Sequence, residues 1–449
     1  MTKIDPRDFI GGPFEDCPKC GKHELGVLNI ADNSYTRRCR DCWHTHTRSL
    51  PKLSKKIIYL DQFVISNVMK MLSANSPGHE RAKSEPRWRA IFEAIGVLRS
   101  MQLVVCPAST EHHDESLISG FFEELRHTYE HFATGIAFSD STSIQDMQIT
   151  EAFECWLNKQ PPKFDLEPNR ITRRNPHAWG DRIFITVSGE LPGYKQAVQR
   201  SRKNVHGRLA SLFKRWQAEK SDFEKVFEFE KSWYATSILQ GIEEDRKRME
   251  ELQFRFARLG PLPRYMPEYS RTMNTPLMYS LQWMAELHLV KEQRPNPEYD
   301  RRDIKEQARE KAIAFVQSGA MNETPSNILA ASLYAALARK AATGQKKLPD
   351  EGMVTDIRVL STLLPYCDAM FVDNFCRSLL HDVPKKYRLP YRALVFSPNT
   401  VGPFLEYLAS IRASVSPDHL KMLTEVYGPK ALEPPKSIYG IGSRQPQSS

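Results

Sequence analysis

The chain has 449 residues, of which 41% are hydrophobic and 26% charged, an ordinary composition for a globular protein. It contains no apolar run long enough to cross a membrane, and its first residues lack the apolar core of a signal peptide, so we expect a cytoplasmic protein that avoids the membrane. The formal net charge of +9 permits binding to nucleic acid without establishing it.

Residues 1–52 are predicted to form a small zinc ribbon. Two C-x2-C pairs, Cys17/Cys20 and Cys39/Cys42, are separated by 18 residues that fit a short β-hairpin. Zinc takes four thiolates in a tetrahedron, and each pair can supply two of them from one tight turn. Since four cysteines leave no open position on the metal, we expect a structural zinc. Contact with nucleic acid is suggested by the basic residues of this segment: Arg37, Arg38, Arg40, Arg48 and Lys52.

Residues 53–120 are predicted to begin an α/β domain. The apolar run 57–60 is typical of a strand covered on both faces, and it ends in Asp61. A helix over 89–98 and a second strand over 101–106 should follow. Glu111 then enters a helix that Ser109 or Thr110 can cap.

Residues 121–324 are rich in charged residues and mostly helical in pattern, and they are predicted to form a large helical insertion. Residues 208–259 lack proline and could hold one or two long helices. From Tyr194 to Lys220 there are eight Lys or Arg residues and a single acid. This basic stretch is either a solvated helix face or a nucleic-acid-binding surface. A homo-oligomer or a protein partner that contacts the insertion also remains open.

Residues 325–430 return to an α/β pattern, and the tail 431–449 is predicted to be disordered. Helices are expected over 327–340, 355–364 and 374–380. The strand 369–372, which follows Asp368, ends in Asp373, and a last strand is expected over 393–396.

Carboxylates follow two of the predicted strands, because Asp61 and Asp373 each end an apolar run, and Glu111 comes after a third. Asp356 shares a helix face with apolar residues, where an acid needs a partner or a metal; alternatively it is an ordinary acid at a helix N-terminus. The carboxyl edge of a parallel sheet is where ligands bind. Several acids there would repel each other unless a divalent cation held them together.

Tyr59-Leu60-Asp61, the strand segment with Glu111, and the stretch from Asp356 to Asp373 together resemble the PIN-like nuclease superfamily, over roughly residues 55–120 and 325–412. The resemblance implies an α/β fold: a Rossmann-like α/β/α sandwich with a parallel sheet, here interrupted by the helical insertion. It also implies that Asp61, Glu111, Asp356 and Asp373 hold one or two Mg²⁺ or Mn²⁺ ions. RNA would be the expected substrate, cleaved by a metal-activated water.

Four further residues are secondary candidates. Glu115 lies one helical turn after Glu111 and could share or replace its role. Asp368 is a candidate acid or a turn residue. Ser66 and Asn374 match the small polar residues that family members place near the first and last acids. Where the family usually has Thr or Ser just ahead of the last acid, this chain has Phe371-Val372.

The sequence therefore predicts a metal-dependent endoribonuclease, and family analogy suggests a toxin or defence effector. One alternative is a zinc-ribbon nucleic-acid-binding protein with an inactive nuclease-like core. Another is an HD-type metal phosphohydrolase built on His79 and the run Glu111-His112-His113-Asp114, but those proteins are all-helical, and the apolar strands argue against it.

Overall fold

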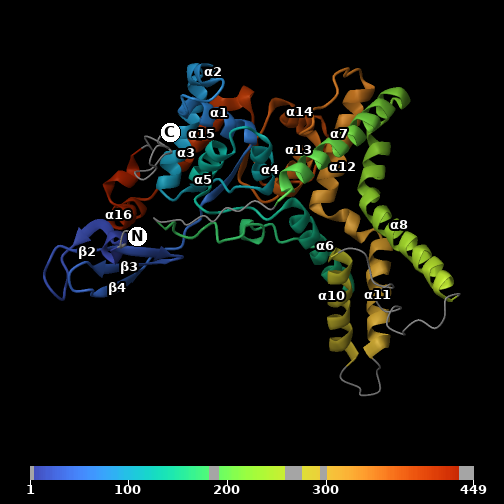
Figure 1. Ribbon diagram of the computed structural model, residues 1–449, viewed down its shortest axis with the longest axis horizontal. Helices are drawn as coiled ribbons and strands as arrows, with labels where there is room; N and C mark the ends of the chain where they lie inside the picture. Colours follow the sequence, from blue (N-terminus) through green and yellow to red (C-terminus); the bar gives the residue numbers. More distant parts are fainter. Residues whose placement is uncertain (1–4, 182–191, 258–275, 294–300, 434–449) are drawn as a thin grey trace.

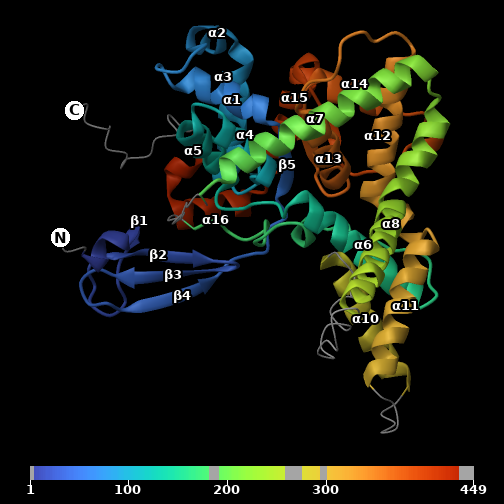
Figure 2. The same cartoon turned by 45° about the vertical axis from the view of Figure 1, so that its right-hand side comes forward.

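The computed structural model describes residues 5–181, 192–257, 276–293 and 301–433 (Figure 1). It shows a mixed α/β protein with one antiparallel and one parallel sheet, each of four strands. The antiparallel sheet lies near the N-terminus, and long helices extend from the opposite side of the parallel sheet (Figures 1 and 2). None of the helices in the described ranges is long and apolar enough to cross a membrane. Of the predicted disordered tail, residues 434–449 lie outside the described residues.

The antiparallel sheet follows a short 3-10 helix, η1 (Pro6–Phe9), and has the strand order β1-β2-β3-β4. Its strands are β1 (Gly11–Glu15), β2 (Leu25–Ala31), β3 (Ser34–Cys39) and β4 (Thr45–Ser49). Tyr35, Arg37 and Cys39 alternate along β3 and are buried, so this strand turns one face inward. The predicted hairpin between the two cysteine pairs is confirmed as β2 and β3.

The parallel sheet has the order β6-β5-β7-β8, and every neighbouring pair is parallel. Its strands are β5 (Lys56–Leu60), β6 (Val104–Val105), β7 (Ala369–Phe371) and β8 (Leu394–Phe396). Ile57 and Tyr59 belong to one apolar cluster, whereas Ile58 and Leu60 belong to another. Because successive side chains of a strand point to opposite faces, both faces of this sheet are covered.

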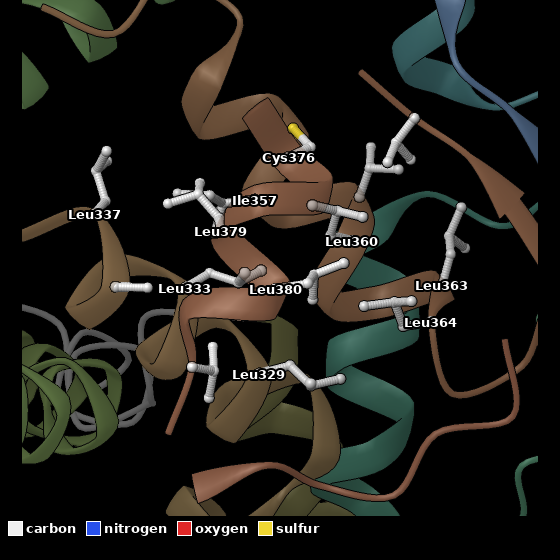
Figure 3. Packing of buried hydrophobic residues seen from close by; sticks show 14 of the residues in the cluster. Leu329, Leu333, Leu337, Ile357, Leu360, Leu363, Leu364, Cys376, Leu379 and Leu380 are labelled. Atoms are coloured by element: carbon white, nitrogen blue, oxygen red, sulfur yellow. The ribbon is translucent and has the colours of Figure 1, made fainter. Parts of the chain in front are cut away.

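Helices of the C-terminal part cover the first face. They are α12 (Pro325–Ala342), α13 (Met353–Leu363) and α14 (Asn374–Asp382). Figure 3 shows Leu333 and Leu337 of α12 facing Ile357 of α13 and Leu379 of α14. Burial of each such leucine contributes roughly 1.5–3 kcal/mol to stability. Alanines between the leucines of α12 allow the neighbouring helices to approach closely.

The other face of the parallel sheet is covered by helices from two distant parts of the chain: α1 (Gln62–Leu72), α3 (Pro86–Ser100), α5 (Phe122–Ala133) and α15 (Val401–Ala413). Phe371 of the central strand β7 packs against Phe404 of α15, with ring centroids 5.0 Å apart. Leu125 and Phe132 place α5 in the same cluster. The insertion, as predicted from residue 121, therefore opens with a helix that packs against the sheet unit.

The remaining long helices are α6 (Ser141–Leu157), α7 (Tyr194–Glu219), α8 (Phe223–Ala257), α10 (Pro276–Gln293) and α11 (Arg301–Gln317). Helix α7 runs across α12 and α13, whereas α10 and α11 project away from the sheet (Figure 2). Phe153, Met278 and Phe315 form a separate core among α6, α10 and α11. Helix α8 runs along α12, which ties the projecting helices to the sheet. The shorter elements are α2 (His79–Ser84), α4 (Thr110–Ile118), α16 (Pro417–Tyr427), η2 (Pro168–Arg170), η3 (Ala320–Glu323), η4 (Lys385–Tyr387), η5 (Pro398–Thr400) and η6 (Pro429–Leu432).

The antiparallel sheet docks on α16 through charged contacts. Arg48 Nη1 donates to Glu425 Oε1 at 3.0 Å, and the buried Arg37 donates to the backbone oxygen of Glu425 at 3.0 Å. Tyr35 Oη also donates to Glu425, at 2.5 Å. Arg37 and Arg48, considered above as nucleic-acid contacts, thus have structural partners. Both are engaged in holding the N-terminal sheet to the rest of the chain.

Candidate functional site

Strands β5 and β7 lie side by side although more than 300 residues separate them. From β5 the chain moves outward to β6 on one side, and it later returns to β7 and β8 on the other. Helix α1 follows β5 on one face of the sheet, whereas α14 follows β7 on the opposite face. Such a switch in strand order, at the carboxyl ends of the strands, is where open parallel sheets bind ligands.

Asp61 and Asp373 occupy this edge, and each caps the helix that follows its strand. Asp61 Oδ1 accepts a hydrogen bond from the backbone N–H of Phe63 at 3.1 Å, at the start of α1. Asp373 Oδ1 accepts from the backbone N–H of Cys376 at 2.6 Å, at the start of α14. A cap of this kind fixes the orientation of a carboxylate while using one of its two oxygens.

Asp356 joins the group from the first turn of α13, four residues after the N-cap Gly352. Its carboxylate, the carboxylate of Asp373 and the thiol of Cys376 have ligand atoms that all lie within 4.8 Å of one another. Asp356 and Asp373 are half-buried and Cys376 is buried. The structure therefore brings two of the predicted acids together in a group that could hold a metal ion.

The acids at this edge disfavour one another's ionisation. Burial raises the pKa of Asp356 to about 9, and the charges of Asp61, Glu115 and Asp373 add to the effect. Burial likewise raises the pKa of Asp61 to about 7, with further upward contributions from Glu115 and Asp373, although the N–H of Phe63 opposes the shift. A divalent cation would remove this penalty by pairing with the ionised oxygens.

Helix α4 carries both Glu111 and Glu115, and the charge of Glu115 has the larger effect on the pKa values of these aspartates. The charge of Glu115 is among the main causes that raise the pKa of Asp61 and of Asp356, whereas Glu111 is not among them. Glu111 Oε1 instead accepts a hydrogen bond from Ser141 Oγ at 2.6 Å. Burial raises the pKa of Glu115 itself, and the guanidinium of Arg202 opposes that shift.

The other secondary candidates are Asp368, Ser66 and Asn374. Asp368 sits before the opposite end of β7, where it pairs with Lys56 at 3.0 Å and with Arg392 at 2.8 Å. Its Oδ2 accepts from the backbone N–H of Ile57 at 2.9 Å, so it fastens two strands. Ser66 is half-buried on α1, five residues after Asp61. Asn374 is exposed, and its Oδ1 accepts from the backbone N–H of Asn399 at 3.2 Å.

Three residues near the site were not singled out from the sequence. Asp350, in the loop before α13, raises the pKa values of Asp61, Glu115 and Asp356 through its charge. Cys376 is three residues after Asp373, and Arg202 lies within the basic stretch. A signal existed for Asp350 in the run Leu348-Pro349-Asp350, which lies a few residues before the predicted helix 355–364.

Two histidines of the HD-type alternative, His112 and His79, have local partners. The ring of His112 is buried and stacks on Tyr59 with centroids 5.2 Å apart. Its Nδ1 accepts from the backbone N–H of Ser109, and burial lowers its pKa to about 4, so the imidazole is neutral at pH 7. Nδ1 of His79 lies 2.8 Å from the backbone oxygen of Lys70. These contacts do not favour that alternative.

The four N-terminal cysteines form the second group with metal-ligand geometry. Their sulfur atoms lie within 4.8 Å of one another, with 3.5 Å between Cys17 and Cys42 and 3.7 Å between Cys20 and Cys39. A tetrahedral zinc with Zn–S bonds of about 2.3 Å requires sulfur–sulfur separations of roughly 3.8 Å. The cluster could therefore hold a zinc ion, as the two C-x2-C pairs predict.

Comparison of the chain with protein-family models, with curated proteins and with solved structures finds no match.

Proposed function

We propose that the protein is a metal-dependent nuclease of the PIN-like type, which cleaves RNA phosphodiester bonds. The observation that carries the proposal is the convergence of acids at the switch point between β5 and β7. There, carboxylate oxygens of Asp356 and Asp373 lie within 4.8 Å of each other, and burial together with repulsion between the acids raises the pKa values of Asp356 and Asp61. Acids with strongly raised pKa values cluster at functional sites in proteins, because their burial destabilises the fold and is retained where they serve a function.

The donor set fits a hard divalent cation. Carboxylate oxygens are the ligands that Mg²⁺ and Mn²⁺ prefer, and Asp61, Asp356 and Asp373, with Glu115 or Glu111, would supply them. A bound ion would act as a Lewis acid that lowers the pKa of water for attack on a phosphodiester. The capped helices keep Asp61 and Asp373 in fixed positions, so the ligands need little reorganisation when the ion binds.

Two further features of the chain, its basic charge and its N-terminal cysteines, bear on the substrate and on a structural zinc. The net charge of +9 and the basic helix α7 beside the site favour a polyanionic substrate. The four N-terminal cysteines would hold a structural Zn²⁺ in a ribbon that is docked on α16. Cleavage in the cytoplasm, as a toxin or defence effector, is the role that the family resemblance suggests.

A cleavage assay tests this function. Wild-type protein would be incubated with single-stranded RNA and single-stranded DNA in Mn²⁺, in Mg²⁺ and in EDTA, with Asp356→Asn alongside. We expect metal-dependent cutting of RNA that EDTA and the substitution both abolish. Tight binding of RNA by both proteins without cutting would instead support a nucleic-acid-binding protein with an inactive core.

A further inference from the structure

Arg202 is the member of the basic stretch that turns toward the acids. It lies on α7, which runs beside α4 and α13 in both views (Figures 1 and 2). Its side chain is 25% exposed, and its Nη2 is 3.4 Å from Glu115 Oε1. Arg200 and Lys203, its neighbours on the same helix, are exposed. One cation of α7 is thus directed inward while its neighbours face solvent.

The electrostatic surroundings make this position unusual. Arg202 lowers the pKa of Glu115, whereas the main upward causes at Asp61 and Asp356 are burial and other carboxylates. Arg202 therefore places a permanent positive charge beside acids that would bind a cation. A residue of this charge opposes metal binding in itself, so its presence needs another reason.

The hydrogen bonding of Arg202 is incomplete. A guanidinium has five N–H donors, and most buried donors in proteins have partners. Nε of Arg202 is buried and has no hydrogen-bond partner among the described residues, and the contact of Nη2 with Glu115 is long at 3.4 Å. A Cβ placed on Gly352 would lie 3.4 Å from Asp350 Oδ1, 3.6 Å from Asp356 Oδ2 and 3.9 Å from Nη2 of Arg202, so the arginine and both acids face this glycine.

We propose that Arg202 binds a phosphate group of the substrate beside the carboxylates, an inference that rests on the proposed nuclease function. The planar fork of arginine matches two oxygens of a phosphate, and the charge of Arg202 would stabilise the negative charge that develops on them during attack. Asp61, Asp356 and Asp373 bind the cation, and Arg202 binds the anion that the cation attracts. The missing partner of Nε is a phosphate oxygen.

This role makes a prediction that a purely structural role does not. Removal of a positive charge beside metal ligands strengthens metal binding or leaves it unchanged. Removal of a structural arginine would loosen α4 against α7, so metal affinity and melting temperature would fall together. Phosphate affinity and metal affinity should therefore move in different directions in Arg202→Gln.

The experiment uses full-length wild-type protein, Arg202→Gln, Arg202→Lys and, as a matched control on the exposed side of α7, Arg200→Gln. Calorimetry measures the affinity for Mn²⁺ alone and then the affinity of the Mn²⁺-loaded protein for inorganic phosphate. For Arg202→Gln we expect at least tenfold weaker phosphate binding with Mn²⁺ affinity equal or higher, and kcat on RNA lower by about 10²–10³-fold. Arg202→Lys should recover part of the phosphate affinity, and Arg200→Gln should match the wild type in both titrations.

Unchanged phosphate affinity in Arg202→Gln would overturn the inference. So would a joint fall in Mn²⁺ affinity and melting temperature, or a wild-type protein that binds no phosphate. The two titrations need no cleavage. If the wild type binds Mn²⁺ and phosphate but cuts no RNA, the nuclease proposal fails, while the loss of phosphate binding in Arg202→Gln still decides the role of Arg202.

Discussion

Asp356 and Asp373 bring carboxylate oxygens to within 4.8 Å of each other from two different helices, α13 and α14. Asp356 lies in the first turn of its helix, and Asp373 is the N-cap of the other. Helix N-termini favour negative charge, so both positions offset part of the repulsion between the two acids. Burial nevertheless leaves the pKa of Asp356 at about 9, which makes this pair costly to ionise without a cation.

Asp356→Asn should stabilise the metal-free protein at pH 8. Because burial and four neighbouring acids oppose ionisation of Asp356, a neutral side chain of similar shape removes this unfavourable interaction. We expect the free energy of unfolding without metal to rise by roughly 1–2 kcal/mol, a small part of what the pKa shift implies. Thermal melts with EDTA and with Mn²⁺ measure this, and Mn²⁺ should stabilise only the wild type. A lower melting temperature of the variant in EDTA would contradict the electrostatic account.

Metal affinity should rise with pH. The pKa values of Asp61 and Asp356, about 7 and about 9, lie above the ordinary value of 3.8, so the folded chain binds more protons than the unfolded chain in this range. The stability of the metal-free protein should consequently fall as pH rises from about 4 to about 9. Mn²⁺ must displace those protons, and its affinity should increase over the same interval. Calorimetric titration at pH 6, 7 and 8 measures it, and a flat profile would count against these acids as ligands.

Glu115→Gln should weaken Mn²⁺ binding and cleavage more than Glu111→Gln does. The charge of Glu115 acts on Asp61 and Asp356, whereas the carboxylate of Glu111 is hydrogen-bonded to Ser141. The two substitutions are a matched pair on one helix, and Mn²⁺ affinity together with kcat compares them. Equal affinity in the two variants, or a larger loss in Glu111→Gln, would show that the arrangement of α4 changes when metal binds.

Cys39→Ser should remove zinc and release the N-terminal sheet. A structural zinc contributes apparent folding free energy on the order of 10 kcal/mol in small domains. Loss of the metal should expose residues 5–52 to proteolysis and break the contacts of Tyr35 and Arg48 with Glu425. Metal analysis and limited proteolysis check this, with Cys155→Ser, outside the cluster, as the control. Unchanged zinc content in Cys39→Ser would exclude the cysteine cluster as the site.

The strands that carry the site residues could be predicted from the local sequence. The apolar runs before Asp61 and Asp373 predict β5 and β7, and both strands form in parallel. The predicted second strand was too long, because residues 101–106 were expected but only Val104–Val105 pairs with β5. The reason lies in the turn before it: α3 continues to Ser100, and Gln102 takes a positive φ of 59°.

Which residues gather at the site depends on tertiary contacts that local sequence patterns do not encode. Glu111 and Glu115 share a helix face, and the rotation of α4 against Asp61 decides which of them approaches. Arg202 is one of eight cations in the basic stretch. It differs from the others through its proximity to α4 and α13, which lie more than 80 residues away in the sequence. In the same way, Leu125 and Phe132 mark an apolar face on α5, yet only packing shows that this face covers the sheet unit.

The most direct measurement compares cleavage of single-stranded RNA in Mn²⁺ by wild-type protein, Asp373→Asn and Asp368→Asn. The two aspartates flank opposite ends of β7: Asp373 lies at the acid group, and Asp368 pairs with Lys56 and Arg392. At a temperature where all three proteins remain folded, the account predicts that Asp373→Asn abolishes cutting, whereas Asp368→Asn lowers the melting temperature but still cuts. Cleavage by Asp373→Asn at the wild-type rate would contradict the proposed metal centre.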